Sequence, residues 1–449
     1  MKFLKDKLFL KSMFSIAIPI SLQNLITSSL NMVDTLMTSS LGQSSIAAVG
    51  LANQIFFFYI LINFGISTGS SVFISQYWGK KDISGIRKVL GLAIFISTAV
   101  GIVFTVAAAI FPEFLMKIFI DIPETVRLGS EYLRIVAFSY IITGISFVIS
   151  VGLRSTGSPK IPLKISIVSF SSNTFFNYIF MFGKLGLPAM GVKGAALGTL
   201  IARVIEISLL LYSVYSSKGP LAGSLKELFG WNKEFINKYL KTTSPVIFNE
   251  GFWSLGQVMY SIAYARIGEE ATAAIQVVTT IQNVFFVIFR GLANSSSVMI
   301  GNKIGEGDEK QAYDYAVNFL IISGLLGVVF GLCMILSSDL TLKLFRNLDK
   351  GLYDTANSII FVMGLVFFIK TFNATVIVGV FRGGGDTTFS MFLEIGSVWL
   401  IGVPMAFIGA LILKLPVHFV VVLVSLEEIV KALISIPRVM SKKWIKNVT

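Results

Sequence analysis

The chain has 449 residues, of which 54% are hydrophobic and only 14% are charged, and its mean hydropathy is +0.80. Soluble proteins average about 25% charged residues, so this composition excludes a water-soluble globular enzyme. A membrane span needs about 20 apolar residues, and this length accommodates about a dozen spans. We therefore expect an all-α integral membrane protein with many spans.

Apolar runs separated by short polar breaks predict about twelve transmembrane helices. The first run continues from Phe14 to Leu30 without a small-residue cleavage site, so we interpret it as a retained span and not as a signal peptide. The spans are expected near residues 12–37, 46–76, 89–111, 130–152, 162–182, 192–215, 240–266, 272–300, 314–336, 355–380, 388–412 and 417–437.

The formal charge of +13 would suggest a nucleic-acid partner in a soluble domain. When segments are assigned alternately to the two sides, about 23 Lys and Arg lie on the side of the termini and about 9 on the other. This positive-inside bias predicts a plasma-membrane protein with both termini in the cytoplasm. The basic clusters then meet membrane lipids, and we expect no nucleic-acid partner.

Cysteine and histidine are too few for the usual metal or disulfide chemistry. The chain contains one cysteine, Cys333, and one histidine, His418. An intramolecular disulfide and a Cys-based or multi-His metal site are therefore excluded.

The only long polar connection, Ser216–Lys241, lies between the sixth and seventh predicted spans. Within 225–241, apolar residues recur near helical spacing, which predicts an amphipathic helix in the headgroup plane. We expect this linker to join an N-terminal six-helix bundle, residues 1–224, to a C-terminal six-helix bundle, residues 225–449.

The second half of the sequence repeats the first at an offset of about 226 to 228 residues. Six spans against six give both halves the same orientation, related by a pseudo-two-fold axis along the membrane normal. Such an architecture places a cavity between two bundles and favours a transporter that works by alternating access. The less common residues that coincide include Pro19 with Pro245, Gly65 with Gly291, Asp82 with Asp308, Arg154 with Arg382 and Arg203 with Lys431.

Several motifs identify a family. The chain resembles the multidrug and toxic compound extrusion (MATE) transporters, relatives of lipid and polysaccharide flippases, over essentially its whole length. The resemblance is specific for the family but not for a substrate. It rests on Ile18-Pro19, Met32-Val33-Asp34-Thr35, Gln76-x-x-Gly79 with Asp82, Gly152-Leu-Arg154-Ser-Thr-Gly157, Asn173, Asn177-Tyr178, Gly186-x-Pro188, Gly194-Ala-Ala-x-Gly-Thr199 and Arg382-Gly-Gly-Gly-Asp386-Thr387.

Asp34 is an ionisable residue inside the first predicted span, where such groups are costly and usually functional. Pro19, about fifteen residues earlier, cannot donate to Ser15, which predicts a bend point that can act as a hinge of the helix. Asn173 and Asn177 share one face of the fifth span, and neutral oxygens beside a carboxylate suit a small hard cation.

The resemblance implies that Asp34, Asn173, Asn177 and Thr199 gather in the N-terminal bundle as a cation- or proton-responsive site. Some relatives carry Asp where this chain has Asn177, and one carboxylate in place of two weakens Na⁺ binding. Both H⁺ and Na⁺ therefore stay open as the coupling ion, with Asp34, Asn173 and Asn177 as the Na⁺ ligands. Capping or pairing of Asp34, and helix-to-helix hydrogen bonding by the asparagines, are the alternatives.

Glu250, shortly after Pro245, matches an acidic residue of the subfamily that exports cationic drugs. The resemblance implies a substrate or proton site in the C-terminal bundle, but the Asp that usually accompanies it falls near Thr371 or Asn373. A buried structural hydrogen bond is the alternative for Glu250. Glu394 and Arg290 are also deep enough to pair across helices, and the sequence does not choose between them.

The other charged residues of the spans lie toward predicted helix ends, where long side chains can reach the headgroups. We expect structural roles for them. They are Arg203, Glu206, Glu427, Glu428 and Lys431.

The function expected is secondary efflux of amphipathic, cationic organic compounds in exchange for H⁺ or Na⁺, by a monomer without a cofactor. Gly383–Gly385 lack the Lys-Ser/Thr of a phosphate-binding loop and suit a tight turn. A flippase for lipid-linked oligosaccharide precursors is the alternative within transport. A membrane enzyme would need clustered carboxylates or a histidine base, which the sequence does not contain.

Overall fold

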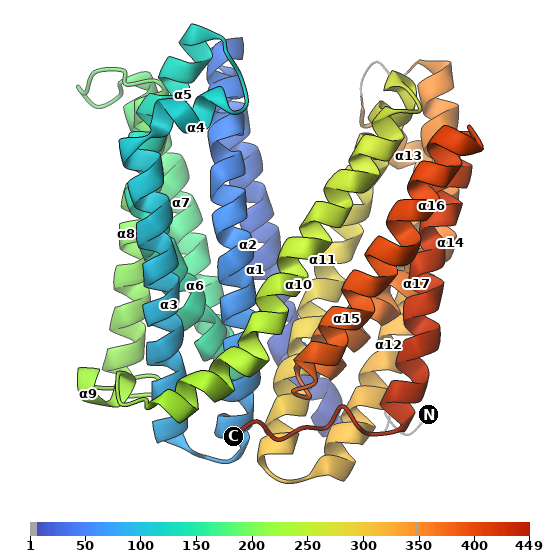
Figure 1. The fold of residues 1–449 in the computed structure, drawn as a ribbon. Coiled ribbons are helices and arrows are strands. Elements are labelled where there is room, and N and C mark those ends of the chain that lie inside the picture. Colours follow the sequence, from blue (N-terminus) through green and yellow to red (C-terminus); the bar gives the residue numbers. More distant parts are fainter. Residues whose placement is uncertain (1–6, 346–348) are drawn as a thin grey trace. The chain divides into compact units, whose positions relative to one another are not determined.

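The computed structural model describes residues 7–345 and 349–449, and within those ranges every regular element is a helix. Figure 1 shows the helices in chain order. The first half contains α1 (Lys7–Ser39), α2 (Gln43–Gly79), α3 (Ile83–Ile110), α4 (Pro112–Lys117), α5 (Pro123–Val136), α6 (Phe138–Ser155), α7 (Lys160–Phe182), α8 (Val192–Ser216) and α9 (Leu225–Leu228). The second half contains α10 (Lys233–Ala265), α11 (Glu269–Gly305), α12 (Glu309–Leu336), α13 (Ser338–Leu342), α14 (Lys350–Ala374), α15 (Thr387–Ser397), α16 (Val403–Phe407) and α17 (Val417–Met440), with π-helical stretches η2 (Thr375–Arg382), η3 (Val398–Gly402) and η4 (Ile408–Ile412).

Every predicted span coincides with a helix or a run of consecutive helices. In the part of the chain that the structure describes, nine helices are long and apolar enough to cross a membrane by length and composition. The other three predicted spans correspond to α7, α10 and α17. Their polar and charged residues lower the hydropathy, and those residues include Asn177, Glu250 and Glu427.

The described chain forms two compact units. The N-unit is Leu22–Ile247, and the C-unit joins the described residues up to Ser21 to Phe248–Thr449. Helices α1 and α10 therefore each begin in one unit and end in the other. These units differ from the division at 224/225, which remains a prediction for the two bundles. Pro19 inside α1 and Pro245 inside α10 each lie two residues before a unit boundary.

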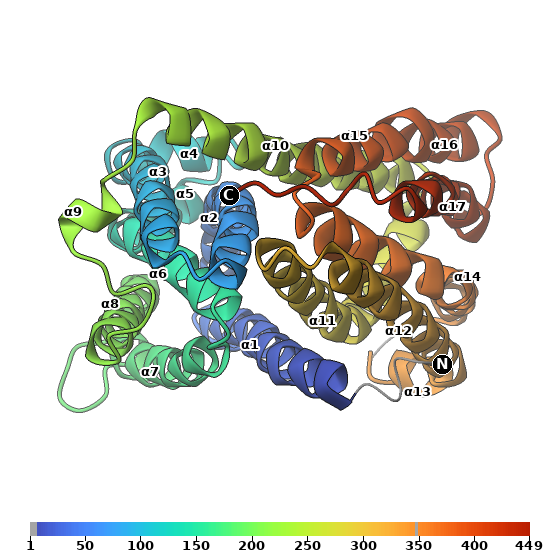
Figure 2. The same cartoon turned by 90° about the horizontal axis from the view of Figure 1, so that it is seen from below.

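In the N-unit, α2 packs against α3, α5 and α6, and α7 packs along α8 (Figure 2). The first half of α10 belongs to this unit and lies against α2, where the Tyr239 hydroxyl is 2.7 Å from the Ser70 hydroxyl. The approach is close because Gly65 has no side chain: a Cβ there would lie 2.6 Å from the Ile247 Cα.

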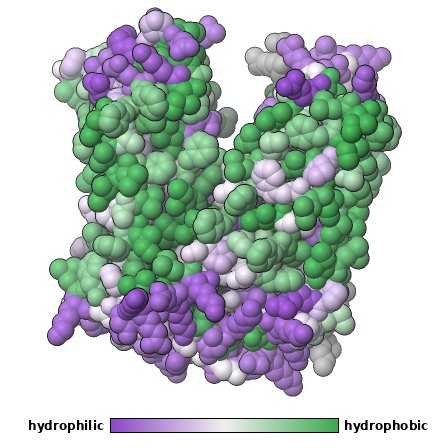
Figure 3. Space-filling model, viewed as in Figure 1, coloured by the Kyte–Doolittle hydropathy of each residue, from purple (hydrophilic) through white to green (hydrophobic). Residues whose placement is uncertain are grey.

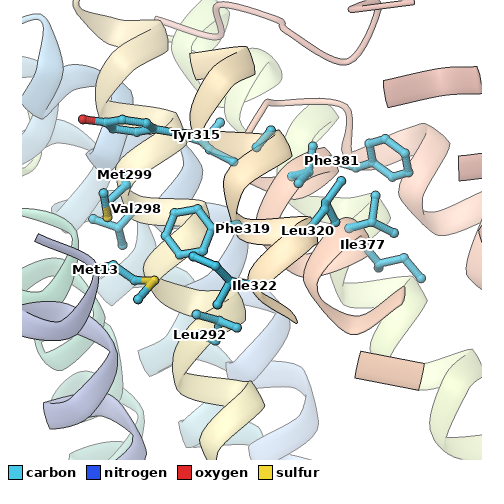
Figure 4. Packing of buried hydrophobic residues seen from close by; sticks show 14 of the residues in the cluster. Met13, Leu292, Val298, Met299, Tyr315, Phe319, Leu320, Ile322, Ile377 and Phe381 are labelled. Atoms are coloured by element: carbon cyan, nitrogen blue, oxygen red, sulfur yellow. The ribbon is translucent and has the colours of Figure 1, made fainter. Parts of the chain in front are cut away.

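In the C-unit, the first half of α1 is enclosed by the helices of the second repeat. Figure 4 shows Met13 of α1, Leu292 of α11 and Phe319 of α12 directed into one apolar cluster. Gly291 permits this packing, because a Cβ there would be 2.6 Å from the Ala17 carbonyl oxygen. The start of α1 and the end of α17 lie at the same end of the C-unit (Figure 1), as an even number of spans requires.

The surface of each unit agrees with a position in a bilayer. Hydrophilic residues gather at the two ends of each unit, and a hydrophobic band separates them on the face seen in Figure 3. The large hydrophobic side chains that the predicted spans expose include Phe95, Val103, Leu325 and Leu332. Lipid tails accept such residues, whereas water would not.

The connection at 225–241 differs from the single amphipathic helix that the spacing predicted. Helix α9 ends at Leu228, and α10 begins at Lys233. The break occurs at Gly230, after which the Asn232 Oδ1 accepts from the Phe235 backbone N–H at 2.9 Å and caps α10. Local capping therefore divides the segment, and its second part extends the seventh span.

Helix α9 is held by polar contacts outside the apolar spans. The Glu227 carboxylate accepts from the Ser224 backbone N–H at 2.7 Å and lies 2.5 Å from Arg87. The Ser224 backbone hydrogen bond, with smaller contributions from the Ser224 hydroxyl and Arg87, lowers the pKa of Glu227. The linker is thereby anchored to α3 of the N-unit.

The close contact at Gly65 is testable. Gly65→Ala is expected to lower the free energy of unfolding by about 1–3 kcal/mol, because its Cβ meets the α10 backbone. Gly50→Ala in the same helix meets nothing within 4 Å and should raise stability by about 0.5–1 kcal/mol through helix propensity. Thermal unfolding in detergent measures both variants, and equal upward shifts would contradict the packing.

Candidate ion-coupling site

The four residues expected to form a coupling site meet in the N-unit. The Asn177 Nδ2 donates to the Asp34 Oδ1 at 2.8 Å and to the Asn173 Oδ1 at 3.1 Å. The Asn173 Nδ2 donates to the Thr199 hydroxyl at 3.2 Å. One line of hydrogen bonds thus connects α1, α7 and α8.

The backbone of α8 places Asn177 at the centre of this line. Gly194 and Gly198 are four residues apart, the small-xxx-small spacing that lets membrane helices approach closely. A Cβ at Gly194 would lie 2.5 Å from the Phe180 carbonyl carbon, and a Cβ at Gly198 would collide with the Asn177 Oδ1. Both glycines are therefore needed for the contact between α7 and α8.

Asp34 is half-buried and forms no ion pair with any of the described residues. Its side-chain partner is the neutral amide of Asn177, whose own Oδ1 is buried and has no hydrogen-bond donor. Within residues 7–345 and 349–449, no three His, Cys, Asp or Glu side chains are grouped to hold a metal ion. A cation here would be held by one carboxylate and neutral oxygens.

Arg203 and Glu206 lie inside the N-unit, and the prediction that they reach toward the headgroups is wrong for Glu206, which is 9% exposed. The Arg203 guanidinium is 2.6 Å from the Glu206 carboxylate, which also accepts from the Ser169 hydroxyl at 3.2 Å. The ion pair within α8 offsets the free-energy cost of burying the Glu206 carboxylate, so this side chain does not need to reach the membrane surface.

Glu250 belongs to an ion-pair cluster in the C-unit. The Arg382 Nη1 is 2.6 Å from the Glu250 carboxylate, and the Arg382 Nη2 is 3.3 Å from Glu394. Asn249 donates to Glu394 at 2.5 Å. The sequence analysis named Arg382 as the repeat partner of Arg154 and as part of a family motif, without a role in this cluster. The turn that it predicted at Gly383–Gly385 is confirmed.

The position of Arg382 depends on the helix that carries it. Arg382 is 2% exposed and ends η2, a π-helical stretch that replaces the ordinary helical register. Such stretches are common at functional sites because they redirect side chains. No periodicity in the sequence reveals this change of register, so the partner of Glu250 was missed.

A second buried cluster of the C-unit corrects the prediction for α17. Glu427 and Lys431 are 5% and 3% exposed, and their charged atoms are 3.4 Å apart. The Tyr260 hydroxyl donates to Glu427 at 2.5 Å, and Asn373 donates to Glu428 at 2.7 Å. These charges are satisfied within the unit and do not extend to the headgroups.

The sequence analysis also named Thr371, Arg290 and Glu394, and their contacts differ from one another. The Thr371 hydroxyl, the other candidate for an acidic counterpart, donates to Ser323. Arg290 is exposed on α11 and forms no ion pair among the described residues, whereas Glu394 pairs with Arg382. Of the two deep charged residues that the sequence left open, Glu394 is therefore the one that forms an ion pair across helices.

Removing Arg382 should lower the free energy of unfolding, because two carboxylates lose their ion-pair partner. Arg382→Gln is expected to destabilise the protein by about 3–5 kcal/mol, because Glu250 and Glu394 lose the ion-pair partner that they share. Adding Glu250→Gln and Glu394→Gln to the same chain should recover most of the loss. Thermal unfolding of the single and triple variants tests this, and equal stabilities would exclude the charge explanation.

Comparisons with known proteins agree with this architecture. A family model described as MatE matches residues 19–179 and again 245–408. The uncharacterized transporter YisQ of Bacillus subtilis is 29% identical over 450 aligned residues, covering 98% of this chain and 96% of that protein. A probable multidrug resistance protein NorM of Thermotoga maritima is 23% identical and covers 89% of this chain and 85% of its own length.

The fold is also shared with solved structures. The crystal structure of a MATE protein in the bent conformation has a TM-score of 0.89 at 20% identity, over 97% of this chain and 96% of that one. The two MatE matches begin at Pro19 and Pro245, the same offset as the internal repeat. The chain therefore belongs to the MatE family and is a multi-pass membrane transporter with the two-bundle, twelve-helix MATE fold, not an enzyme.

Proposed function

We propose that this transporter exports amphipathic, cationic organic compounds in exchange for H⁺ or Na⁺, with Asp34 as the residue that carries the coupling ion. The observation that supports this most is the carboxylate of Asp34, which lies within a span, has a neutral amide as its partner and forms no ion pair with the described residues. A carboxylate that is half-buried within a span and has no ion-pair partner favours binding a proton or a small cation. The name of the NorM relative supports the substrate class.

Two modes of ion binding fit the side chains. A proton would bind Asp34 directly and leave the hydrogen-bonded line of Asn177, Asn173 and Thr199 in place. Na⁺ would need the Asn177 amide to turn, so that its Oδ1, now without a donor, faces the ion beside Asp34 and Asn173. A sodium site with a single carboxylate would be weak. Transport measurements under a proton gradient and under a Na⁺ gradient decide between the two ions.

Coupling requires that the ion and the substrate stabilise different states of the transporter. Pro19 deprives α1 of a backbone hydrogen bond close to a unit boundary, and we assign it as a hinge for the α1 segment that carries Asp34. The matched MATE crystal structure in a bent conformation supports bending within this fold. Ion binding at Asp34 would then bias the bend.

Glu250 stays in the proposal as a substrate or proton site of the C-unit. Its ion pair with Arg382 sets a condition, because a cationic substrate or a proton has to replace the guanidinium. We further propose a plasma-membrane location with cytoplasmic termini, and a monomer as the working unit, since each predicted site is completed within one chain.

The coupling role of Asp34 can be tested in liposomes. Purified protein should export a fluorescent organic cation under an imposed pH gradient or an imposed Na⁺ gradient. Asp34→Asn should reduce gradient-driven export roughly tenfold or more, because the amide cannot take up a proton and removes the one negative charge that would hold Na⁺. Asp121→Asn, an exposed acid of the same unit, is the matched control and should transport normally.

The outcome also separates the candidate functions. If one gradient drives export by wild type and not by Asp34→Asn, that gradient identifies the coupling ion. If neither gradient moves the dye although the protein is folded, drug efflux is wrong for this chain, and flipping of lipid-linked sugars becomes the better hypothesis.

Pro19 offers a second, independent test. Pro19→Ala restores the missing backbone donor and should straighten α1, which lowers the transport rate about tenfold while ion binding at Asp34 is retained. The transport rate and the ion-dependent shift in melting temperature are measured on the same preparation. Unchanged transport would show that α1 does not hinge at this residue.

A further inference from the structure

The two units contain the same three-helix junction, related by the internal repeat. In the N-unit, the Arg154 Nη2 donates to the Gln23 Oε1 at 2.5 Å, and the Gln23 Nε2 donates to the Ser166 hydroxyl at 2.9 Å. The repeat places three residues of the C-unit at the equivalent positions of the equivalent helices. They are Arg382 for Arg154, Asn249 for Gln23 and Glu394 for Ser166.

The charges of the two junctions differ. In the C-unit, Arg382 is neutralised by Glu394 and by Glu250. The repeat counterparts of these acids in the N-unit are Ser166 and Asn24, which are both neutral. Arg154 accordingly forms no ion pair with the residues that the structure describes.

The guanidinium of Arg154 also lacks a partner on one of its nitrogens. Its Nε is buried and donates to no acceptor, and its one recorded side-chain hydrogen bond goes to a neutral amide. A guanidinium withdrawn from water costs several kcal/mol unless a negative group compensates it. The equivalent arginine, Arg382, has two carboxylates of its own chain as compensation, and the N-unit junction has neither.

We propose that the N-unit junction is an anion-binding site, in which Arg154 holds the oxyanion of a carboxylate or phosphate group. The planar fork of arginine donors matches the paired oxygens of both groups. The neutral residues Asn24 and Ser166 stand at the repeat positions of Glu250 and Glu394, and Gln23 links Arg154 to Ser166 by hydrogen bonds. Arg154, Asn24 and Ser166 are partly exposed, so a ligand can reach them, whereas Arg382 is fully enclosed.

This site lies beyond the proposed coupling function, because it involves none of the residues around Asp34. The oxyanion has two possible sources, the phosphate of an anionic phospholipid headgroup or a soluble anion. Both present the same oxygens to Arg154, and the experiment has one arm for each source.

The soluble arm measures the melting temperature of the full-length protein in a neutral detergent, during titration with inorganic phosphate at constant ionic strength. The lipid arm counts bound phosphatidylglycerol by native mass spectrometry, with phosphatidylcholine as the reference. A stabilisation of wild type by about 2–4 °C, or a retained phosphatidylglycerol, is expected in one arm.

Two variants test whether Arg154 is responsible. Arg154→Gln removes the cation. Asn24→Glu leaves Arg154 in place and introduces a carboxylate at the position equivalent to Glu250. Both should abolish the response, and Asn24→Glu should raise the melting temperature without ligand. If Arg154→Gln fails to fold, Asn24→Glu still decides.

Lys164→Gln, which removes an exposed cation from α7, is the matched control and should respond as wild type does. A response that survives in both Arg154→Gln and Asn24→Glu would overturn the assignment. So would the absence of any response of wild type in both arms. Loss of export by Asp34→Asn is a separate result and leaves this test unaffected.

Discussion

The structure depends on one constraint: a polar side chain inside the hydrocarbon region has to be satisfied by other parts of the protein. In the N-unit, neutral amides and a hydroxyl form a line that ends on Asp34. In the C-unit, the buried charges are matched as ion pairs, with Arg382 between two carboxylates and Lys431 beside Glu427. The same constraint thus produces ion pairs in the C-unit, whereas Asp34 and Arg154 of the N-unit have neutral amides as their hydrogen-bond partners.

The internal repeat shows how the two units diverged in chemistry while they kept their geometry. Tyr260 occupies the repeat position of Asp34, and Glu427 occupies that of Thr199. The carboxylate has therefore moved from the first helix of the repeat to the sixth, where the Tyr260 hydroxyl donates to it at 2.5 Å. Lys431, the counterpart of Arg203, then neutralises it. Asp34 forms no ion pair of this kind with a described residue, because Arg203 pairs with Glu206.

Helices α1 and α10, which each begin in one unit and end in the other, occupy equivalent positions in the internal repeat. Gly65 admits α10 at Ile247, and Gly291 admits α1 at Ala17 and Ser21. Ile247 and Ser21 are themselves repeat partners, so each unit holds the first half of the helix that the other unit completes. The two prolines near these contacts weaken both helices at the points where a unit boundary crosses them.

The sequence by itself determined the membrane class, the helix positions, the repeat, the family and the membership of the Asp34 cluster. Hydropathy and spacing are local properties, and the family motifs are written in the chain, so they need no coordinates. Tertiary structure alone decided the partners of the buried charges. Arg382 reaches Glu250 across 132 positions of sequence, from a π-helical stretch that no periodicity marks. The short α9, the exchanged half-helices and the burial of Glu427 likewise depend on which faces meet in space, because burial and pairing are properties of contacts between distant segments.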